Sequence, residues 1–167
     1  MRKYLLVLLV TLCSLGKAHA DSIFVDSGIA YKIVSADTVN VVKLADGKSY
    51  TRTFNDSLLT IPSSISHDGK KYWVKCIEQY AFSGCPQLSD LTLGSSLKEI
   101  AFNAFNGISI PSLVLPESLE ILGNGAFNSC KSLESVKIGN RLEKIGDNAF
   151  EKCANLTDLT IGSGVVT

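Results

Sequence analysis

Few residues of this 167-residue sequence could do chemistry. Its five cysteines lie at positions 13, 76, 85, 130 and 153, and its two histidines are His19 and His67. A Ser-His-Asp triad needs a histidine that an acid orients. His67 instead stands beside Asp68-Gly69, where a solvated turn residue is expected. The patterns G-x-S-x-G and H-E-x-x-H and a phosphate-binding loop are missing, so the sequence predicts no catalytic residue and no enzyme.

The first 20 residues have the pattern of an export signal. Arg2 and Lys3 give a positive start, residues 4–15 form an apolar run, and a small-x-small pattern ends at Ala20. The run is too short to span a bilayer comfortably. We therefore expect cleavage after Ala20 and a secreted or cell-surface protein. A lipid anchor on Cys13 ranks second, because Leu12 is not the small residue that such a signal needs.

The charge of the exported chain excludes one class of partner. Loss of three basic residues with the leader leaves 13 basic and 16 acidic residues, a net charge of −3. No basic stripe stands in the sequence, so a nucleic-acid partner is not expected. No later segment is long and apolar enough to span a membrane, so we expect a soluble chain with no transmembrane segment after cleavage.

An internal repeat organises the second half of the chain. Ala-Phe pairs fall at 81–82, 104–105, 126–127 and 149–150, at intervals of 23, 22 and 23 residues. An aliphatic residue precedes each pair by four positions, and an L-x-x-L-x-L pattern follows the first, third and fourth pairs. The second copy is one residue shorter and carries Ile108 where the others carry cysteine. A motif that recurs in this way is typical of a structural unit that must be stacked.

The L-x-x-L-x-L pattern with this period is the leucine-rich-repeat signature. Alternation places its leucines on one side of a short strand, and stacked coils then pair these strands in a parallel sheet. The A-F-x-x-C segment is expected to return as a tight turn or a short helix. The predicted repeat core is Ile77, Phe82, Cys85, Leu88, Leu91, Leu93, Ile100, Phe105, Leu113, Leu115, Leu122, Phe127, Cys130, Leu133, Val136, Ile138, Ile145, Phe150, Cys153, Leu156, Leu159 and Ile161.

The full pattern, I-x-x-x-A-F-x-x-C-x-x-L-x-x-L-x-L-G/P, resembles the BspA-like (Treponema-type) leucine-rich repeats of bacterial surface and secreted proteins. The resemblance is strong over 77–166 and weaker upstream. It implies adhesion, by binding host extracellular proteins or other bacteria. The predicted fold is a β-rich α/β solenoid of coils of about 23 residues, with the leader at 1–20, an antiparallel β-hairpin cap at 21–75 and about four coils at 76–167, the last incomplete.

The cap region is rich in β-formers. Strands are expected at 29–34, 39–44, 50–54 and 71–74, with hairpin turns at Asp46-Gly47 and Asp68-Gly69. A hairpin over 29–53 should cover the N-terminal end of the stack. Trp73 is interpreted as a core or cap residue, with exposed binding as the alternative.

The cysteines after the leader are predicted to be buried thiols. An even number in an exported chain favours disulfides, but Cys85, Cys130 and Cys153 hold the same repeat position and should all point into the core, where cysteine acts as a small hydrophobe. Cys130 with Cys153 is the one pair that could form a bridge. With no C-x-x-C and only His67 after the leader, no metal site and no cofactor are expected.

What remains is a surface formed by the side chains that alternate with the core leucines. These candidate binding residues are Asp90, Thr92, Ser112, Val114, Ser135, Lys137, Asp158 and Thr160. We expect a non-enzymatic protein that binds an extracellular protein or glycan through this face. The alternative for these positions is simple solvation. The alternative function is a short assembly module that stacks on itself or on a longer repeat protein through the uncapped C-terminal coil, because Val165 and Val166 lack a capping sequence.

Overall fold

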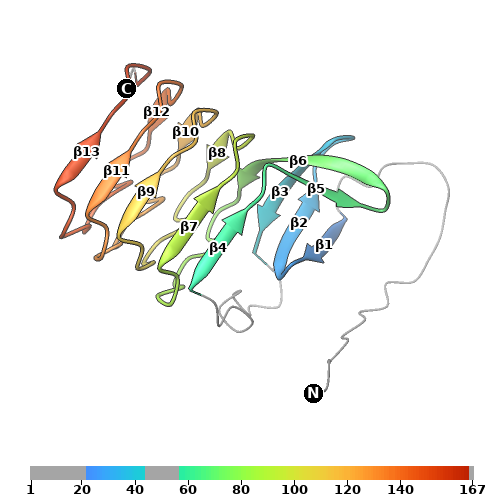
Figure 1. The fold of residues 1–167 in the computed structure, drawn as a ribbon, viewed down its shortest axis with the longest axis horizontal. Helices are drawn as coiled ribbons and strands as arrows, with labels where there is room; N and C mark the ends of the chain where they lie inside the picture. The colour runs from blue at the N-terminus through green and yellow to red at the C-terminus, as the bar shows by residue number, and fades with distance from the viewer. Residues whose placement is uncertain (1–21, 44–56, 166–167) are drawn as a thin grey trace.

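The computed structural model describes residues 22–43 and 57–165, and Figure 1 shows a row of stacked coils beside a smaller antiparallel unit. The predicted leader with its cleavage site at Ala20, the Asp46-Gly47 turn, the strand at 50–54 and Val166 lie outside the described residues. The strands are β1 (Ile23–Asp26), β2 (Ile29–Ile33), β3 (Thr38–Val42), β4 (Leu58–Ile61), β5 (Ser64–His67), β6 (Lys70–Ile77), β7 (Asp90–Leu93), β8 (Glu99–Ile100), β9 (Ser112–Val114), β10 (Ile121–Leu122), β11 (Ser135–Lys137), β12 (Lys144–Ile145) and β13 (Asp158–Thr160).

Each coil contributes one strand to each of two walls. One wall has the strand order β1-β2-β3-β6-β8-β10-β12, with β5 added beside β6. The other wall holds β4-β7 and β9-β11-β13 as two short sheets that lie side by side (Figure 1). We call these the long wall and the short-sheet wall.

The repeat period sets the register between coils. Leu122 pairs with Ile100 on one side and with Ile145 on the other, all in parallel. On the short-sheet wall, Val136 pairs in the same way with Leu113 and Leu159. One repeat in the sequence is therefore one step in the stack, as the spacing of the Ala-Phe pairs predicts.

The helical part of the predicted fold class is wrong for the described residues, which contain no helix. Each A-F-x-x-C segment is a turn flanked by residues of positive φ. Tyr80, Asn103, Gly125 and Asn148 precede the Ala-Phe pairs with φ between +50° and +62°. A second left-handed residue, for example Gly84 (φ +73°), follows each phenylalanine by two positions. A residue with positive φ has a left-handed backbone conformation, which interrupts a right-handed helix.

The core lies between the two walls. Fourteen of the predicted core residues are buried: Ile77, Phe82, Cys85, Leu88, Ile100, Phe105, Leu113, Leu115, Leu122, Phe127, Cys130, Leu133, Val136 and Ile138. Six are partly buried and packed against this cluster: Leu91, Leu93, Ile145, Phe150, Cys153 and Leu156. Leu159 and Ile161 contradict the prediction, being 46% and 50% exposed. In the described chain β13 has a paired neighbour on one side only, β11, so no further coil covers these two side chains.

The antiparallel cap is present in part. Strands β1, β2 and β3 pair antiparallel, and β3 then joins β6 in parallel, so the cap extends the long wall. Strands β5 and β6 form a hairpin through Asp68 and Gly69, whose φ values are +49° and +72°. This confirms the turn predicted there.

Strand β4 differs from the prediction that placed it in the cap. It pairs in parallel with β7, with Leu59 opposite Leu91 and Ile61 opposite Leu93. Both Leu59 and Ile61 are buried. The parallel stack therefore includes a strand from before residue 76, and Leu59-x-Ile61-Pro62 repeats the Leu113-x-Leu115-Pro116 pattern of a later coil.

Candidate binding surface

The outward side chains of the short-sheet wall form two ladders. Seven of the eight predicted binding residues are exposed: Asp90, Thr92, Ser112, Val114, Lys137, Asp158 and Thr160. Ser135 is half-buried. Val114 is 65% exposed, the largest value among the exposed apolar residues of the described chain. The predicted residues are therefore brought together on one face, with alternation along each strand as the cause.

The register shows which side chains stand in line. Ser112, Ser135 and Asp158 form one ladder across β9, β11 and β13. Val114, Lys137 and Thr160 form the second. Side chains at paired positions are close enough to contact one ligand together. The face is thus polar and of mixed charge, with Val114 as an apolar point near its centre.

Sequence reasoning missed two members of this surface. Leu58 pairs with Asp90, and Thr60 pairs with Thr92, so the neighbouring sheet of β4 and β7 presents two paired rows of its own. Leu58 is 50% exposed and adds a second apolar point. The signal that could have found them is the alternation in Leu58-Leu59-Thr60-Ile61, with buried residues at the second and fourth positions.

Cys76, Cys130 and Cys153 form no disulfide in the described part of the chain. Cys85 and Cys130 are buried, whereas Cys76 and Cys153 are half-buried. The Cys130 thiol donates to the Phe105 carbonyl oxygen at 3.4 Å, and the Cys153 thiol donates to the Phe127 carbonyl oxygen at 3.2 Å.

The ionisation of these thiols follows their surroundings. Burial, with smaller effects from Glu99 and Glu78, raises the pKa of Cys76 to about 12. The neighbouring Cys130 thiol lowers the pKa of Cys153 to about 7, because it can donate a hydrogen bond to the Cys153 thiolate once that forms. The same interaction, together with burial, raises the pKa of Cys130. Among these thiols, Cys153 should have the largest thiolate fraction near pH 7 and should therefore react fastest.

His67 is not the solvated turn residue that the sequence predicted. It is the last residue of β5, and its ring stacks on Phe24 with centroids 3.7 Å apart and planes 2° from parallel. Its Nε2 lies 3.5 Å from an Asp68 carboxylate oxygen. In the described residues no hydrogen bond joins His67 to a serine or a cysteine, so a nucleophile–base pair is not formed there.

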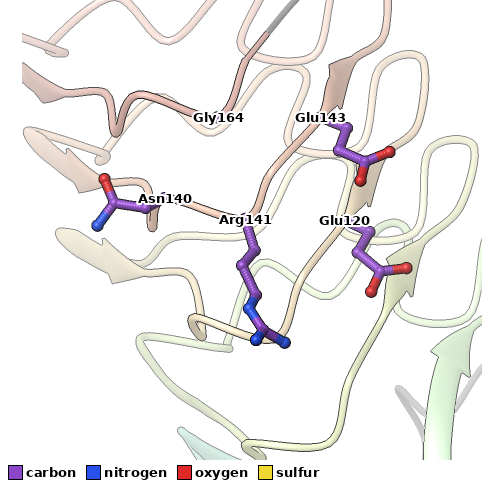
Figure 2. A pocket seen from close by; sticks show the side chains of 5 residues that line it. All are labelled: Glu120, Asn140, Arg141, Glu143 and Gly164. Carbon is purple, nitrogen blue, oxygen red and sulfur yellow. The ribbon is translucent and has the colours of Figure 1, made fainter.

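Two hollows lie on the part of the chain that the structure describes. One, of about 350 Å³, lies at the coil edge and is lined by Glu120, Asn140, Arg141, Glu143 and Gly164. Figure 2 shows the Glu120 and Glu143 side chains extending the same way, with the Arg141 side chain set apart from both. Glu120 forms an ion pair with Lys98. A second hollow, of about 560 Å³, lies between the cap and β4–β5 and includes Asp26 and Tyr31 in its lining.

Metal and membrane sites are not found in residues 22–43 and 57–165. No three His, Cys, Asp or Glu side chains there are grouped so that they could share a metal ion. Nor does any helix of that part of the chain have the length and apolar character to cross a bilayer.

Three exposed aromatic side chains stand away from the short-sheet wall. Trp73, Tyr80 and Phe102 are 39%, 41% and 42% exposed. Tyr80 and Phe102 meet edge to face with centroids 5.2 Å apart. The sequence interpretation allowed Trp73 to be a core residue or a cap residue. The first option is wrong, because its neighbours Tyr72 and Val74 take the inward positions of β6.

Comparison with known proteins decides the family. The family model of the BspA type leucine rich repeat region matches residues 59–167 in six copies. The chain belongs to this family. The match begins upstream of the predicted boundary at 76 and takes in β4, in agreement with the pairing of β4 with β7. No curated protein sequence gave a significant match.

Two solved structures share the fold of this BspA-type protein. The pneumococcal vaccine antigen PcpA is 25% identical, with a TM-score of 0.69 over 87% of this chain and 39% of that chain. A leucine-rich repeat protein from Bacteroides capillosus is 19% identical, with a TM-score of 0.56 over 84% of this chain and 99% of that one. The chain therefore spans well under half the length of the PcpA chain that it matches.

Proposed function

We propose that this BspA-type protein is exported after cleavage at Ala20 and binds an extracellular protein or glycan, without catalysis, through the short-sheet wall. The observation that carries the proposal is the outward face of the two neighbouring short sheets. Paired side chains run from Leu58 and Thr60 on β4 to Asp90 and Thr92 on β7, and from Ser112 and Val114 on β9 to Asp158 and Thr160 on β13. Stacked coils of this kind give extended surfaces that solenoid proteins use for partners.

A role in adhesion fits the family and the export signal. Within the described residues neither His67 nor Cys153 belongs to a nucleophile–base pair, so binding is favoured over chemistry. PcpA is described as a vaccine antigen, which fits a repeat protein that is exposed outside the cell. The proposal for this chain is attachment to host or bacterial surfaces.

The test compares two exposed aliphatic residues on different walls. Val114→Arg places a charge on the proposed face, and Ile121→Arg does the same on the long wall, where Ile121 is 39% exposed. Binding of the purified protein to immobilised fibronectin, laminin and type I collagen is measured by surface plasmon resonance. We expect Val114→Arg to weaken binding by about tenfold or more, and Ile121→Arg to leave it unchanged. Equal losses, or losses only for Ile121→Arg, would overturn the assignment of the face.

A second candidate function is assembly through the last described coil. Leu159 and Ile161 are exposed there, and a strand with one free edge is a template for another strand. Light scattering on the purified protein separates the two functions. A dimer that Leu159→Lys converts to a monomer supports assembly, whereas a monomer at all concentrations removes this candidate.

A further inference from the structure

Trp73 marks a second exposed feature, on the long wall rather than on the proposed binding face. It is the only tryptophan of the sequence, and it is 39% exposed. Tyr72 and Val74, its neighbours in β6, are buried. Alternation therefore turns the indole away from the core. Tryptophan is a residue that contributes strongly to binding when a partner covers it.

Two lysines accompany the indole. The Lys71 ammonium lies 4.3 Å from the ring centroid, and the Lys75 ammonium lies 5.9 Å from it. Both distances permit a cation–π attraction. In the part of the chain that the structure describes, no carboxylate lies within ion-pair distance of either ammonium. Two positive charges are thus held beside an exposed ring without an acidic side chain to neutralise them.

Hydroxyl groups flank the indole across the sheet. Thr38 on β3 and Ser64 on β5 are the residues paired with Trp73, so their side chains share its face. Both are half-buried. The acidic residue beside this row, Asp37, accepts hydrogen bonds from the Ser35 and Thr38 hydroxyls, each at 3.0 Å. The surroundings of the ring are therefore small polar groups and two cations, with the Asp37 carboxylate hydrogen-bonded at the end of the row, rather than apolar walls.

We propose that Trp73, Lys71, Lys75, Thr38 and Ser64, here called the Trp73 patch, bind an acidic polysaccharide. The C–H face of a sugar ring packs on the indole, a carboxylate or sulfate of the sugar pairs with the lysines, and its hydroxyls bond to the threonine and serine. Nucleic acid is disfavoured by the net charge of −3 expected of the chain after cleavage at Ala20. An acidic peptide could pair with the two lysines. Thr38 and Ser64, however, provide no apolar recess in which its side chains could pack.

The test uses the single tryptophan as its own reporter. Purified protein is titrated with polygalacturonate, and with dextran sulfate as a sulfated polymer, while the Trp73 emission is recorded. Binding should shift the emission and weaken as salt is added. Lys71→Gln/Lys75→Gln should reduce the affinity by about tenfold or more, whereas Lys131→Gln/Lys152→Gln removes the same charge elsewhere and should leave it unchanged. Trp73→Leu should also weaken binding, measured by affinity electrophoresis.

Each other outcome overturns the proposal. Equal losses in the two double variants would mean attraction to overall charge alone. Binding of neutral dextran as tightly as polygalacturonate would remove the role of the lysines. Tighter binding of polyglutamate would make the partner an acidic peptide. If no polymer changes the Trp73 emission, the patch does not bind acidic polymers, and the lysines only pack over the indole.

Discussion

Phe127 stacks on Phe105 with ring centroids 5.2 Å apart and planes 10° from parallel. The two residues occupy the same position in adjacent coils, and the stack continues to Phe82 on one side and Phe150 on the other. Stacked aromatic pairs add to the stability that burial alone provides. This column is thus a direct link between the spacing of the Ala-Phe pairs and the packing of the coils.

Phe127→Ala should therefore be strongly destabilising. The side chain is fully buried between two other rings, and we expect a loss of about 3–5 kcal/mol in the free energy of unfolding. Phe150→Ala should cost less, because Phe150 is only partly buried. Urea unfolding measures both. The matched surface change, Thr92→Ala, should stay within about 0.5 kcal/mol. Similar small effects for all three variants would contradict the register.

Lys152→Gly should stabilise the protein. Lys152 has φ +61°, and Gly84 and Gly107 occupy the equivalent position in earlier coils. Relief of the left-handed strain outweighs the entropy that glycine loses, so we expect a gain of about 0.5–1 kcal/mol. Its exposed contact with Glu151, at 3.9 Å, adds little. Lys131→Gly, at a position without positive φ, is the control and should lower the unfolding midpoint. A lower midpoint for Lys152→Gly as well would refute the strain argument.

Cys153 should react with iodoacetamide at lower pH than the other thiols. Its pKa is lowered to about 7 by the hydrogen bond from Cys130, whereas burial raises that of Cys76 to about 12. Because the thiolate is the nucleophile, its alkylation should rise as the pH increases through 7. Mass spectrometry of the alkylated peptides gives the rates.

Cys130→Val tests the cause of that shift. Valine removes the donor, so the alkylation profile of Cys153 should move to higher pH, while Cys130→Ser keeps a donor and should leave it near 7. An unchanged profile in Cys130→Val would show that the hydrogen bond does not set the pKa of Cys153.

The sequence is sufficient to predict the core of the repeats, but not where the stack of coils begins. The Ala-Phe pairs and the leucines define both register and burial, because each must face the inside of a coil. Strand β4 was missed because no Ala-Phe pair stands before Leu59. The sequence does not decide whether the A-F-x-x-C segments are turns or short helices, because Tyr80 and Lys152 are not residues that signal a left-handed backbone.

The two walls differ in how well the sequence predicts them. The face that includes Val114 and Lys137 follows from alternation within a repeated pattern. Trp73 lies outside the repeats, in the run Lys71-Tyr72-Trp73-Val74, where either aromatic residue could face the core. Pairing with Thr38 and Ser64 decides the question, and such long-range pairing cannot be derived from local pattern alone.

The most direct test of the account is hydroxyl-radical footprinting of the protein with and without a partner protein that it binds. A partner seated on the short-sheet wall should protect Leu58, Val114 and Lys137 from oxidation and leave Ile121 unchanged. Protection confined to Ile121, or to Leu159 and Ile161, would contradict the assignment of the binding function to the short-sheet wall.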